Sequence, residues 1–509
     1  MSLSTDAIVT DGPRAGWRAW VALVVLMLPV LLVSMDNTIL NFALPAIAHE
    51  LEPTSAEQLW IIDAYSLMLA GLLVTAGSFG DRIGRRKILL FGAVGFMLTS
   101  VAAVFAPTSE WLIAARAGMG VFGAALMPST MSLLRTTFRH RGQRRIAIAA
   151  WSGAFAAGGA LGPVVGGFLI EHFPWQSVFL LAVPMVGLML VGAPIFVTES
   201  RDPHPGPIDG WGIVLSMLAL APLAYGIKEA AVSGWPGAFG IVIGLAFGWL
   251  FVRRQLRIPH PMLDMALFRR RKFSGSLAVN LCCIMSYIGF LYFVSQHLQM
   301  IVGLTPMAAG LALVPGAVCS VVAGFVVTPF ASRFSAAVVV PICLAVGAGG
   351  LVLVAFAGAG DAWMLVVAFI IMGGGTAAAQ TVSGELIISS APPHRAGAAS
   401  AISETAYEFG AVLGTSILGG ILTAWYRAAL EIPHSVPENL AAHARETLAG
   451  AMNAAEAVGG PLGAALSDAA AEAFDGGITA TSLIGATLLV IACVVSATTL
   501  GRSRTVVSR

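Results

Sequence analysis

Charged side chains are scarce in this sequence. Asp, Glu, Lys and Arg make up 11% of the 509 residues, and hydrophobic residues make up 57%, whereas ordinary soluble domains carry about 25% charged residues. No soluble fold could bury so much apolar surface, so the composition excludes a soluble globular protein. Because a chain in lipid must satisfy its backbone polar groups within each segment, we expect an all-α integral membrane protein.

Cysteine is also scarce, and its placement excludes several kinds of site. All five cysteines lie inside apolar runs, without the spacing of a metal or redox site, so we expect them to be small packing residues. No nucleophile–base set or metal-ligand cluster is recognisable either. We therefore expect neither an enzyme nor a bound cofactor, metal or nucleic acid.

Long apolar runs are what the sequence has in abundance. Since about 20 apolar residues cross the ~30 Å hydrocarbon core as a helix, these runs predict fourteen membrane spans. The first run is followed at once by others, so we expect an uncleaved anchor rather than a signal peptide. The predicted spans cover residues 19–44, 57–80, 88–107, 111–134, 146–170, 176–197, 210–228, 235–252, 274–299, 306–330, 336–357, 362–383, 397–425 and 478–500.

Lys and Arg are distributed unevenly between the loops. Of the 28 basic residues, 24 fall in the even-numbered loops and the two ends, and three (Lys228, Arg427 and Arg445) fall in the odd-numbered loops. Positively charged loops stay on the cytoplasmic side of a membrane. We therefore expect both termini to be cytoplasmic, with the protein in the inner membrane of a bacterial cell.

Two connecting segments are long enough to have structure of their own. Residues 253–273 are basic and amphipathic, which favours a helix on the inner leaflet over a regulatory site. In the Ala-rich external loop 426–477, Ser435 and Glu438 have the spacing of a capping box that opens a helix, and Gly476-Gly477 is expected to end a second one. The prediction for this loop is an external helical hairpin.

A weak internal repeat indicates two halves. Residues 161–169 (LGPVVGGFL) resemble residues 413–422 (LGTSILGGIL), which are one residue longer, and each copy follows a His-Arg pair, His140-Arg141 or His394-Arg395. In membrane proteins with such repeats, binding sites lie near the midplane between the halves. The predicted units are a six-span bundle over 1–197, two inserted spans with linkers over 198–273, and a second six-span bundle over 274–509 that includes loop 426–477.

Four carboxylates lie well inside the predicted spans. They are Asp36, Asp63, Glu404 and Glu408, and Arg116 is the one basic residue placed there. A charge in hydrocarbon is costly, so such residues are usually functional. Four negative charges with one fixed positive charge indicate handling of protons, of cations, or of both.

The four carboxylates are not equivalent in depth or spacing. Glu404 and Glu408 are four residues apart, so they share a helix face with Cβ atoms ~6 Å apart. Burial and mutual repulsion both favour protonation, and we expect the pair to share a proton. Asp36 and Asp63 lie roughly 9–12 Å from the outer surface. Each is either a proton-coupling residue or a polar helix contact, and Asp63 could also serve as an exit site at the outer mouth.

The loop between the second and third spans has a distinct pattern of glycines and charges. Its glycines permit a tight turn with close helix approach, and its charges lie at two helix ends. A conformational role and a purely topological role are both open on the residues alone. The pattern consists of Gly77, Gly80, Asp81, Arg82, Gly84, Arg85 and Arg86.

Two further spans carry small-residue motifs. Arg116 precedes Gly118, Gly120 and Gly123 on one helix, and a buried arginine needs a carboxylate or carbonyl partner, which the sequence does not name. In the fifth span, small residues and one proline let a neighbouring helix pack closely while this helix bends. They are Gly158, Gly162, Pro163, Gly166 and Gly167.

Together these three motifs resemble those of the major facilitator superfamily. Residues 77–86 fit its G-x-[LF]-[AG]-D-R-x-G-R-[RK] signature. The resemblance implies that this loop is a gating latch between the halves, with a conformational role for Asp81 and Arg85. It also implies proton transfer at Arg116, and the motif over 158–167 implies export by antiport.

Other segments narrow the resemblance to the fourteen-span drug:proton antiporter family, nearest to the quaternary-ammonium and methyl-viologen exporters. They are residues 35–45, 59–67, 296–299, 309–316 and 403–410. The implied fold is two six-helix bundles plus two inserted helices. The implied activity is export of lipophilic organic cations (quaternary ammonium antiseptics, dyes, viologens) in exchange for protons.

We expect such a cation to be held by the four carboxylates and by aromatic faces. The expected partners are cationic drugs, protons and membrane lipids, and the chain is expected to act as a monomer. The alternatives are a proton-coupled exporter of an endogenous metabolite with incidental drug efflux, and a channel or passive facilitator. The candidate aromatic residues are Trp60, Tyr65, Tyr287, Tyr407 and Phe409.

Overall fold

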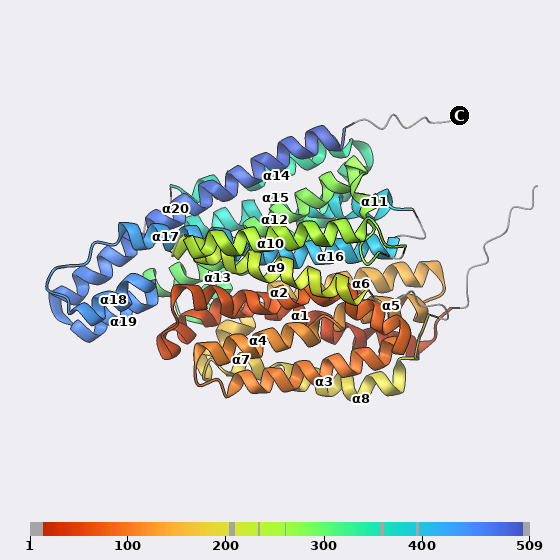
Figure 1. Cartoon of the computed structure of the whole chain (residues 1–509), viewed down its shortest axis with the longest axis horizontal. Helices are drawn as coiled ribbons and strands as arrows, with labels where there is room; N and C mark the ends of the chain where they lie inside the picture. The colour runs from red at the N-terminus through yellow and green to blue at the C-terminus, as the bar shows by residue number, and fades with distance from the viewer. Residues whose placement is uncertain are drawn as a thin grey trace, which may run out of the picture.

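The chain folds into a bundle of long helices (Figure 1). The computed structural model describes residues 14–202, 209–232, 235–259, 261–356, 361–392 and 396–501, and it has no strand over these residues. Fourteen helical segments in this part of the chain are long and apolar enough to cross a membrane. The predicted all-α class and the predicted number of spans are therefore confirmed.

Ten of these segments are single α-helices, and four are interrupted. The single helices are α1 (Trp17–Leu51), α2 (Ser55–Ile83), α3 (Arg85–Val104), α6 (Arg141–His172), α9 (Gly210–Val232), α10 (Trp235–Gln255), α13 (Pro306–Arg333), α14 (Ala336–Val354), α15 (Ala362–Ser390) and α20 (Gly460–Thr499). The interrupted ones are α4 (Ser109–Gly123) with α5 (Leu126–Thr137), α7 (Ser177–Leu180) with α8 (Ala182–Phe196), α12 (Arg271–Gln296) with the π-helical η1 (His297–Ile301), and α16 (Ala396–Leu413) with the π-helical η3 (Gly414–Gly419) and α17 (Gly420–Ala429).

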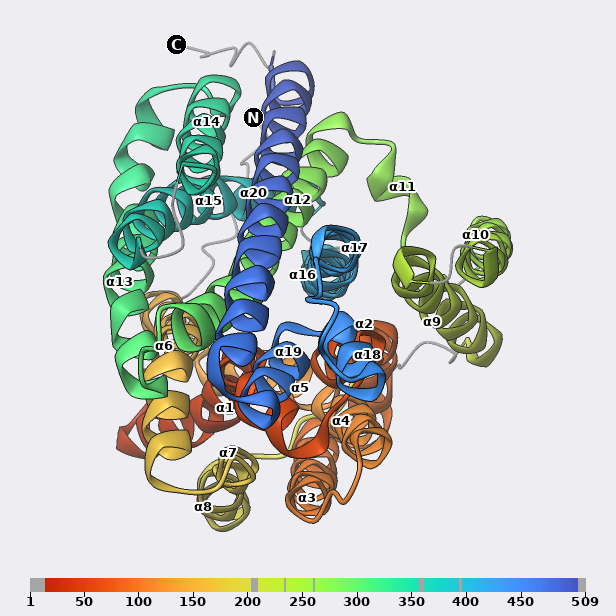
Figure 2. The same ribbon diagram turned by 90° about the vertical axis from the view of Figure 1, so that its left-hand side faces the viewer.

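Seen end-on, the helices form two groups with a hairpin beside them (Figure 2). We call α1–α8 the first half, and α12–α17 with α20 the second half. The halves meet where α2 packs on α16, α6 on α13 and α1 on α12. Helices α9 and α10 pack on each other, and α9 also contacts α2, α17 and η3, so the inserted hairpin covers one seam between the halves.

The hairpin is held together at one end by Asp209, which lies just before α9. Its carboxylate accepts hydrogen bonds from the Gly212 N–H (2.9 Å) and, on α10, from Arg254 (2.7 Å) and Gln255 (2.9 Å). Burial alone raises the pKa of Asp209, but the bonds from these donors outweigh it and hold that pKa below its usual range. These bonds fix where α9 begins relative to α10. They therefore also fix the position of each α9 side chain along the bundle axis.

The second copy of the sequence repeat is one residue longer than the first, and the structure absorbs that residue. Gly414–Gly419 is π-helical, and a π-helical turn holds one residue more than an α-helical turn. Both glycines of this segment lie against neighbouring helices: a Cβ at Gly414 would come within 2.6 Å of the Met285 carbonyl, and one at Gly419 within 2.8 Å of Leu59. His394 and Arg395, which precede this copy, lie outside the described residues.

Two predicted features of segment 426–477 are wrong. The helix α18 (Glu438–Glu446) has Pro437 at its N-cap and no side-chain cap, so Ser435 does not form a capping box. Gly476-Gly477 does not end a helix, because α20 runs through it; the missing Cβ atoms instead let α17 approach, with Trp425 2.7 Å from the Cβ that Gly476 lacks. Helices α18 and α19 (Leu448–Val458) pack on each other beside the start of α20.

The basic connector between the hairpin and the second half is less helical than the sequence predicts. Among the described residues between α10 and α12, only α11 (Met265–Phe268), a single turn, is helical. Leu267 is buried against Phe273 and Ile387, so the connector docks on the second half. Leu267 thus packs against protein, whereas in an amphipathic surface helix it would face lipid.

The two ends of the bundle differ. The end that carries α18 and α19 we call the loop end. Here Ser55 Oγ donates to the Glu446 carbonyl of α18, and Met307 N–H donates to Glu171 at 3.2 Å across the seam between the halves. At the opposite, arginine-rich end, where α3, α6 and α12 begin with arginine, a cavity of about 520 Å³ opens between the halves. The bundle is therefore closed at the loop end and open at the arginine-rich end.

The glycines of α6 permit close packing of this helix on α1. A Cβ at Gly158 would lie 2.7 Å from the Leu31 carbonyl and 2.8 Å from Ser34 Cβ, whereas one at Gly153, on the same helix, would meet nothing within 4 Å. We expect Gly158→Ala to destabilise the fold by about 1–3 kcal/mol, because backbone atoms must move. Thermal unfolding of the purified protein in detergent measures this.

Gly153→Ala is the matched control for that substitution. It should leave the unfolding midpoint unchanged or slightly raised, because alanine is the better helix former. Equal midpoints for the two variants would contradict the close approach of α1 and α6.

Candidate functional site

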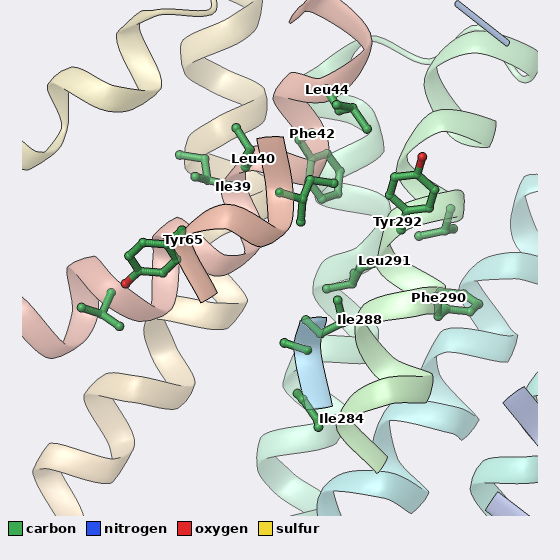
Figure 3. Close-up of a cluster of buried hydrophobic side chains, with 14 of the residues drawn as sticks. Ile39, Leu40, Phe42, Leu44, Tyr65, Ile284, Ile288, Phe290, Leu291 and Tyr292 are labelled. Atoms are coloured by element: carbon green, nitrogen blue, oxygen red, sulfur yellow. The ribbon is translucent and has the colours of Figure 1, made fainter. Parts of the chain in front are cut away.

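Five charged side chains from five helices meet inside the bundle, and we call them the central charged cluster. Asp36 (α1), Asp63 (α2), Arg116 (α4), Lys228 (α9) and Glu408 (α16) expose between 1% and 9% of their surface. Apolar side chains from α1, α2 and α12 pack nearby (Figure 3). In such surroundings each charge needs an opposite charge, a hydrogen-bond donor or a proton.

Arg116 is held by three groups, all in the first half. Its Nη1 donates to Asp36 Oδ2 at 2.5 Å, its Nε donates to the Ile61 carbonyl at 3.1 Å, and its guanidinium lies 4.7 Å from the centre of the Tyr65 ring. Gly120, four residues after Arg116, has the α2 backbone against it, so a Cβ there would collide with the Tyr65 carbonyl. The partner that the sequence could not name is therefore Asp36.

Lys228 is held within the same cluster by a similar set of three groups. Its Nζ lies 3.0 Å from Asp63 Oδ2, donates to the Leu59 carbonyl at 3.2 Å, and sits 3.8 Å from the centre of the Trp60 ring. Ser416 of η3 donates to the same carboxylate oxygen at 3.0 Å. Asp63 is thus shared between the first half, the hairpin and the second half.

The prediction that Lys228 lies in an external loop is wrong. The apolar run was taken to end at the first charge, but α9 continues to Val232 and buries Lys228, which is 1% exposed. The helix continues because a carboxylate, a carbonyl and an aromatic face together satisfy the ammonium group. Asp63 is accordingly neutralised by a neighbouring cation rather than facing an open vestibule.

Glu408 and Glu404 lie one turn apart on α16, as their spacing predicts, but in different surroundings. Glu408 is 4% exposed; its Oε1 accepts a hydrogen bond from Asn37 at 3.4 Å, and its Oε2 is buried without a partner among the described residues. Glu404 lines the 520 Å³ cavity and accepts a hydrogen bond from Ser400 at 3.4 Å. Glu404 therefore faces the open cavity, whereas Glu408, one turn further along α16, lies in the closed centre of the bundle.

A small internal cavity joins the two ion pairs. Its volume is about 10 Å³, room for about one water molecule, and its lining includes Asp36, Asn37, Asp63, Ser66 and Arg116. The Ser66 hydroxyl donates to Asn37 Oδ1 at 3.3 Å, and Asn37 in turn reaches Glu408. Glu408 is thus connected through Asn37 to Ser66, and both of these residues line the cavity together with the two aspartates.

Three of the five candidate aromatic residues lie away from the two bound cations. Tyr287 packs against Phe369 with ring centres 5.8 Å apart. Tyr407 meets Phe155 edge-on at 5.6 Å, across the seam between the halves. Phe409 is half-buried on α16. Of these five candidates, Trp60 and Tyr65 are the two with a basic side chain over the ring.

The glycine- and arginine-rich loop lies at the mouth of the large cavity. Asp81 accepts hydrogen bonds from Arg85 at 2.8 and 2.9 Å. The Arg86 N–H donates to Glu199, and Gly84 has φ +122°, a conformation that leaves no room for a Cβ beside the Glu199 carboxylate. These contacts lie within the first half, whereas the resemblance implies a latch between the halves.

The motif of α6 packs against both halves. Gly158, Gly162 and Gly166 face α1, and Gly167 faces the start of α13, where a Cβ would lie 2.7 Å from Met307 Cα. Pro163 meets α13 as well, because its carbonyl lies against Gly310. These contacts hold the halves together toward the loop end.

Sequence reasoning missed Lys228, Ser416 and Arg135. Arg135 lines the large cavity together with Glu404. The useful cue for Lys228 was the buried Asp63 three residues after Trp60, because a carboxylate and an indole face together form a cation site. A cation near the end of an apolar run can fill such a site, which favours one more helical turn over an early helix end. Among the described residues, no group of three or more His, Cys, Asp or Glu side chains could hold a metal ion.

Comparison with known proteins decides the family. Residues 26–415 match the Major Facilitator Superfamily model. The chain belongs to the Major Facilitator Superfamily. It is 47% identical to the multidrug efflux pump LfrA of Mycolicibacterium smegmatis (95% of this chain, 96% of that protein) and 33% identical to the methyl viologen resistance protein SmvA of Salmonella typhimurium (90% and 93%). The tetracenomycin C resistance and export protein of Streptomyces glaucescens is 32% identical (96% and 93%).

Solved structures of the superfamily share this fold. A bacterial homologue of the human lysosomal transporter Spinster, in an inward-facing and unoccupied conformation, aligns with a TM-score of 0.63 at 20% identity, over 96% of this chain and all of that one. A POT family transporter bound to 5-aminolevulinic acid aligns with a TM-score of 0.62 at 12% identity (95% and 97%). This superfamily member is therefore a multi-pass membrane protein built on the transporter fold.

Removing one charge of the Arg116–Asp36 pair should destabilise this superfamily member more than removing both. Arg116→Gln leaves Asp36 buried without its cation, at an expected cost of about 3–5 kcal/mol. Arg116→Gln combined with Asp36→Asn leaves two neutral groups that can hydrogen-bond, so most of the lost thermal stability should return. Thermal unfolding in detergent measures both.

Arg427→Gln serves as the control, because the Arg427–Glu446 pair is 31–35% exposed and such pairs contribute about 0–1 kcal/mol. Equal losses in the single and double variants would mean that Arg116 acts through packing rather than through charge.

Proposed function

We propose that this chain is a proton-coupled multidrug exporter that exchanges lipophilic organic cations for protons. Quaternary ammonium antiseptics, dyes and viologens are the cargo class. The names of its relatives, a multidrug efflux pump and a methyl viologen resistance protein, support export of drugs. The choice of cations and of proton coupling rests on the chemistry of the central charged cluster.

The observation that carries the proposal is the unequal pairing of the four carboxylates. Asp36 and Asp63 each lie within 3.0 Å of a fixed cation, whereas no basic group among the described residues lies within 4.0 Å of Glu404 or Glu408. An unpaired carboxylate in an apolar interior must take up either a proton or a cation. Glu404 and Glu408 are therefore the residues at which a cargo cation and a proton can replace each other.

The position of the pair suits a cargo that arrives from the open cavity. A lipophilic cation in the 520 Å³ cavity meets Glu404 first and then Glu408, one turn deeper along α16. Tyr407 lies between them in sequence, and Tyr287 and Phe409 add aromatic surface on the second half. Because apolar walls supply most of the contact, selectivity should be broad.

Export then needs the halves to exchange which end is open. In the proposed cycle, cargo binding displaces a proton from the glutamate pair into the cavity, the halves rock about the central cluster, and protons from the other side displace the cargo. Asp36, held by Arg116, and Asp63, held by Lys228, respond to the charge on Glu408 through Asn37, Ser66 and the small cavity. Asp81 and Arg85 stabilise the state in which the arginine-rich end is open.

The arginine-rich end is proposed to face the cytoplasm, as positively charged loops do. The start of α1 and the end of α20 both lie at this end in Figure 1. We accordingly place the protein in the bacterial inner membrane as a monomer surrounded by lipid. The open cavity then faces the source of intracellular cations.

Glu404→Gln and Glu408→Gln should each uncouple transport. In energised inverted vesicles that contain the wild-type protein, added ethidium should release protons from the lumen, which a pH-sensitive dye reports. We expect each variant to reduce that release by between about five- and 150-fold, the usual range of coupling between two sites. Glu385→Gln is the control, because Glu385 is an exposed glutamate on α15, and it should behave as wild type.

Release that is unchanged in Glu404→Gln/Glu408→Gln would overturn the proposal. Ethidium flux that a protonophore leaves unaltered would indicate a passive facilitator instead. If a deletion strain accumulates one of its own metabolites and the vesicles ignore ethidium, the cargo is endogenous, as the name of the tetracenomycin relative also allows.

A further inference from the structure

The surroundings of Lys228 have the composition of a cation-binding site. Its ammonium group touches a carboxylate (Asp63, 3.0 Å), a backbone carbonyl (Leu59, 3.2 Å) and the face of an indole ring (Trp60, 3.8 Å to the ring centre). A carboxylate with an aromatic face is the combination that recognises quaternary ammonium ligands, and tryptophan is the best ring for it. The site is complete, but the chain's own lysine fills it.

The site lies beside the central cavity. Asp63 lines the cavity of about 10 Å³ between the ion pairs, together with Asp36 and Thr415. Asn37, which donates a hydrogen bond to Glu408, lines the same cavity. An organic cation that passed from Glu408 into this region would therefore reach the carboxylate that Lys228 neutralises. Two cations cannot both be neutralised by one carboxylate in a space of low dielectric, so the cargo and the lysine compete.

The two buried cations differ in how firmly they are held. Arg116 and its three partners all belong to the first half, and its planar guanidinium is bound from several sides. Lys228 reaches across from the hairpin to the first half, on a flexible four-carbon stem. Asp63 also accepts a hydrogen bond from Ser416 of the second half, so the Lys228 site lies where the hairpin and the two halves meet.

We infer that Lys228 is a tethered competitor that occupies the cation site formed by Asp63, Trp60 and the Leu59 carbonyl, and that an organic cation binds there by displacing its ammonium group. This rests on the proposed export of cations. The lysine then sets a threshold for cargo: a cation must gain more from Trp60 and the apolar walls than the ammonium loses. Flat or ring-bearing cations meet this condition, and small, strongly hydrated cations do not.

The inference predicts that removing the charge of Lys228 strengthens cargo binding. The apparent dissociation constant equals the intrinsic one divided by the fraction of molecules whose site is vacant. If the lysine fills the site about nine-tenths of the time, Lys228→Met should bind about tenfold more tightly. A lysine that only fastens the hairpin to α2 predicts the reverse, because its loss would loosen the seam.

The test uses the full-length purified protein in lipid nanodiscs and radiolabelled tetraphenylphosphonium as the probe. Lys228→Met should bind about tenfold more tightly than wild type, and Lys228→Arg should bind no more tightly. Adding Asp63→Asn to Lys228→Met should abolish the gain, because the carboxylate is then gone. Lys87→Met, the same substitution at an exposed lysine, should bind as wild type does.

The possible results separate the two claims. If wild type neither binds tetraphenylphosphonium nor exports ethidium, the proposed function fails. If wild type binds the probe and Lys228→Met binds it equally or more weakly, the competitor role is overturned and the proposed function stands. Lys228→Gln, which keeps a hydrogen-bond donor for the Leu59 carbonyl, gives the same comparison where Lys228→Met does not yield a monodisperse protein.

Discussion

A carboxylate inside an apolar bundle must be neutralised, and the architecture of this protein follows from how each one is neutralised. Arg116 neutralises Asp36 within the first half, which ties α1, α2 and α4 together. Lys228 neutralises Asp63 from outside that half, which ties the hairpin to α2. Glu408 accepts a hydrogen bond from Asn37 and has no basic partner within 4.0 Å among the described residues, so it is the member of the cluster whose charge state is not fixed by the fold. The cluster thus contains both carboxylates with a fixed cation and one without.

Close helix packing makes this arrangement possible. The glycines of α6 bring α1 near enough for its polar face to meet α2, and Gly120 brings α4 onto the Tyr65 backbone so that Arg116 reaches Asp36. Where α16 passes the centre, the π-helical η3 places Ser416 toward Asp63. Small residues therefore act on the charges indirectly, by setting how far each side chain must reach.

Much of the fold could be predicted from the sequence, because the length of apolar runs, the placement of arginine and the short motifs are all visible in the order of the residues. Fourteen spans and the family followed from such patterns and are confirmed. The partners of Arg116 and Asp63 could not be predicted, since the pairs join residues 80 and more than 160 positions apart, on helices whose relative rotation no local pattern specifies. Lys228 was misplaced for a related reason: a helix end was set by the first charge, and only tertiary contact explains why that charge is buried.

The hairpin that contributes Lys228 also has an evolutionary consequence. Loss of the hairpin would leave Asp63 and the face of Trp60 without their cation. The hairpin and the aspartate should therefore be gained or lost together. Chains of this superfamily that never acquired the hairpin should have a neutral residue where this one has Asp63, and gain of the one should accompany gain of the other across a phylogeny.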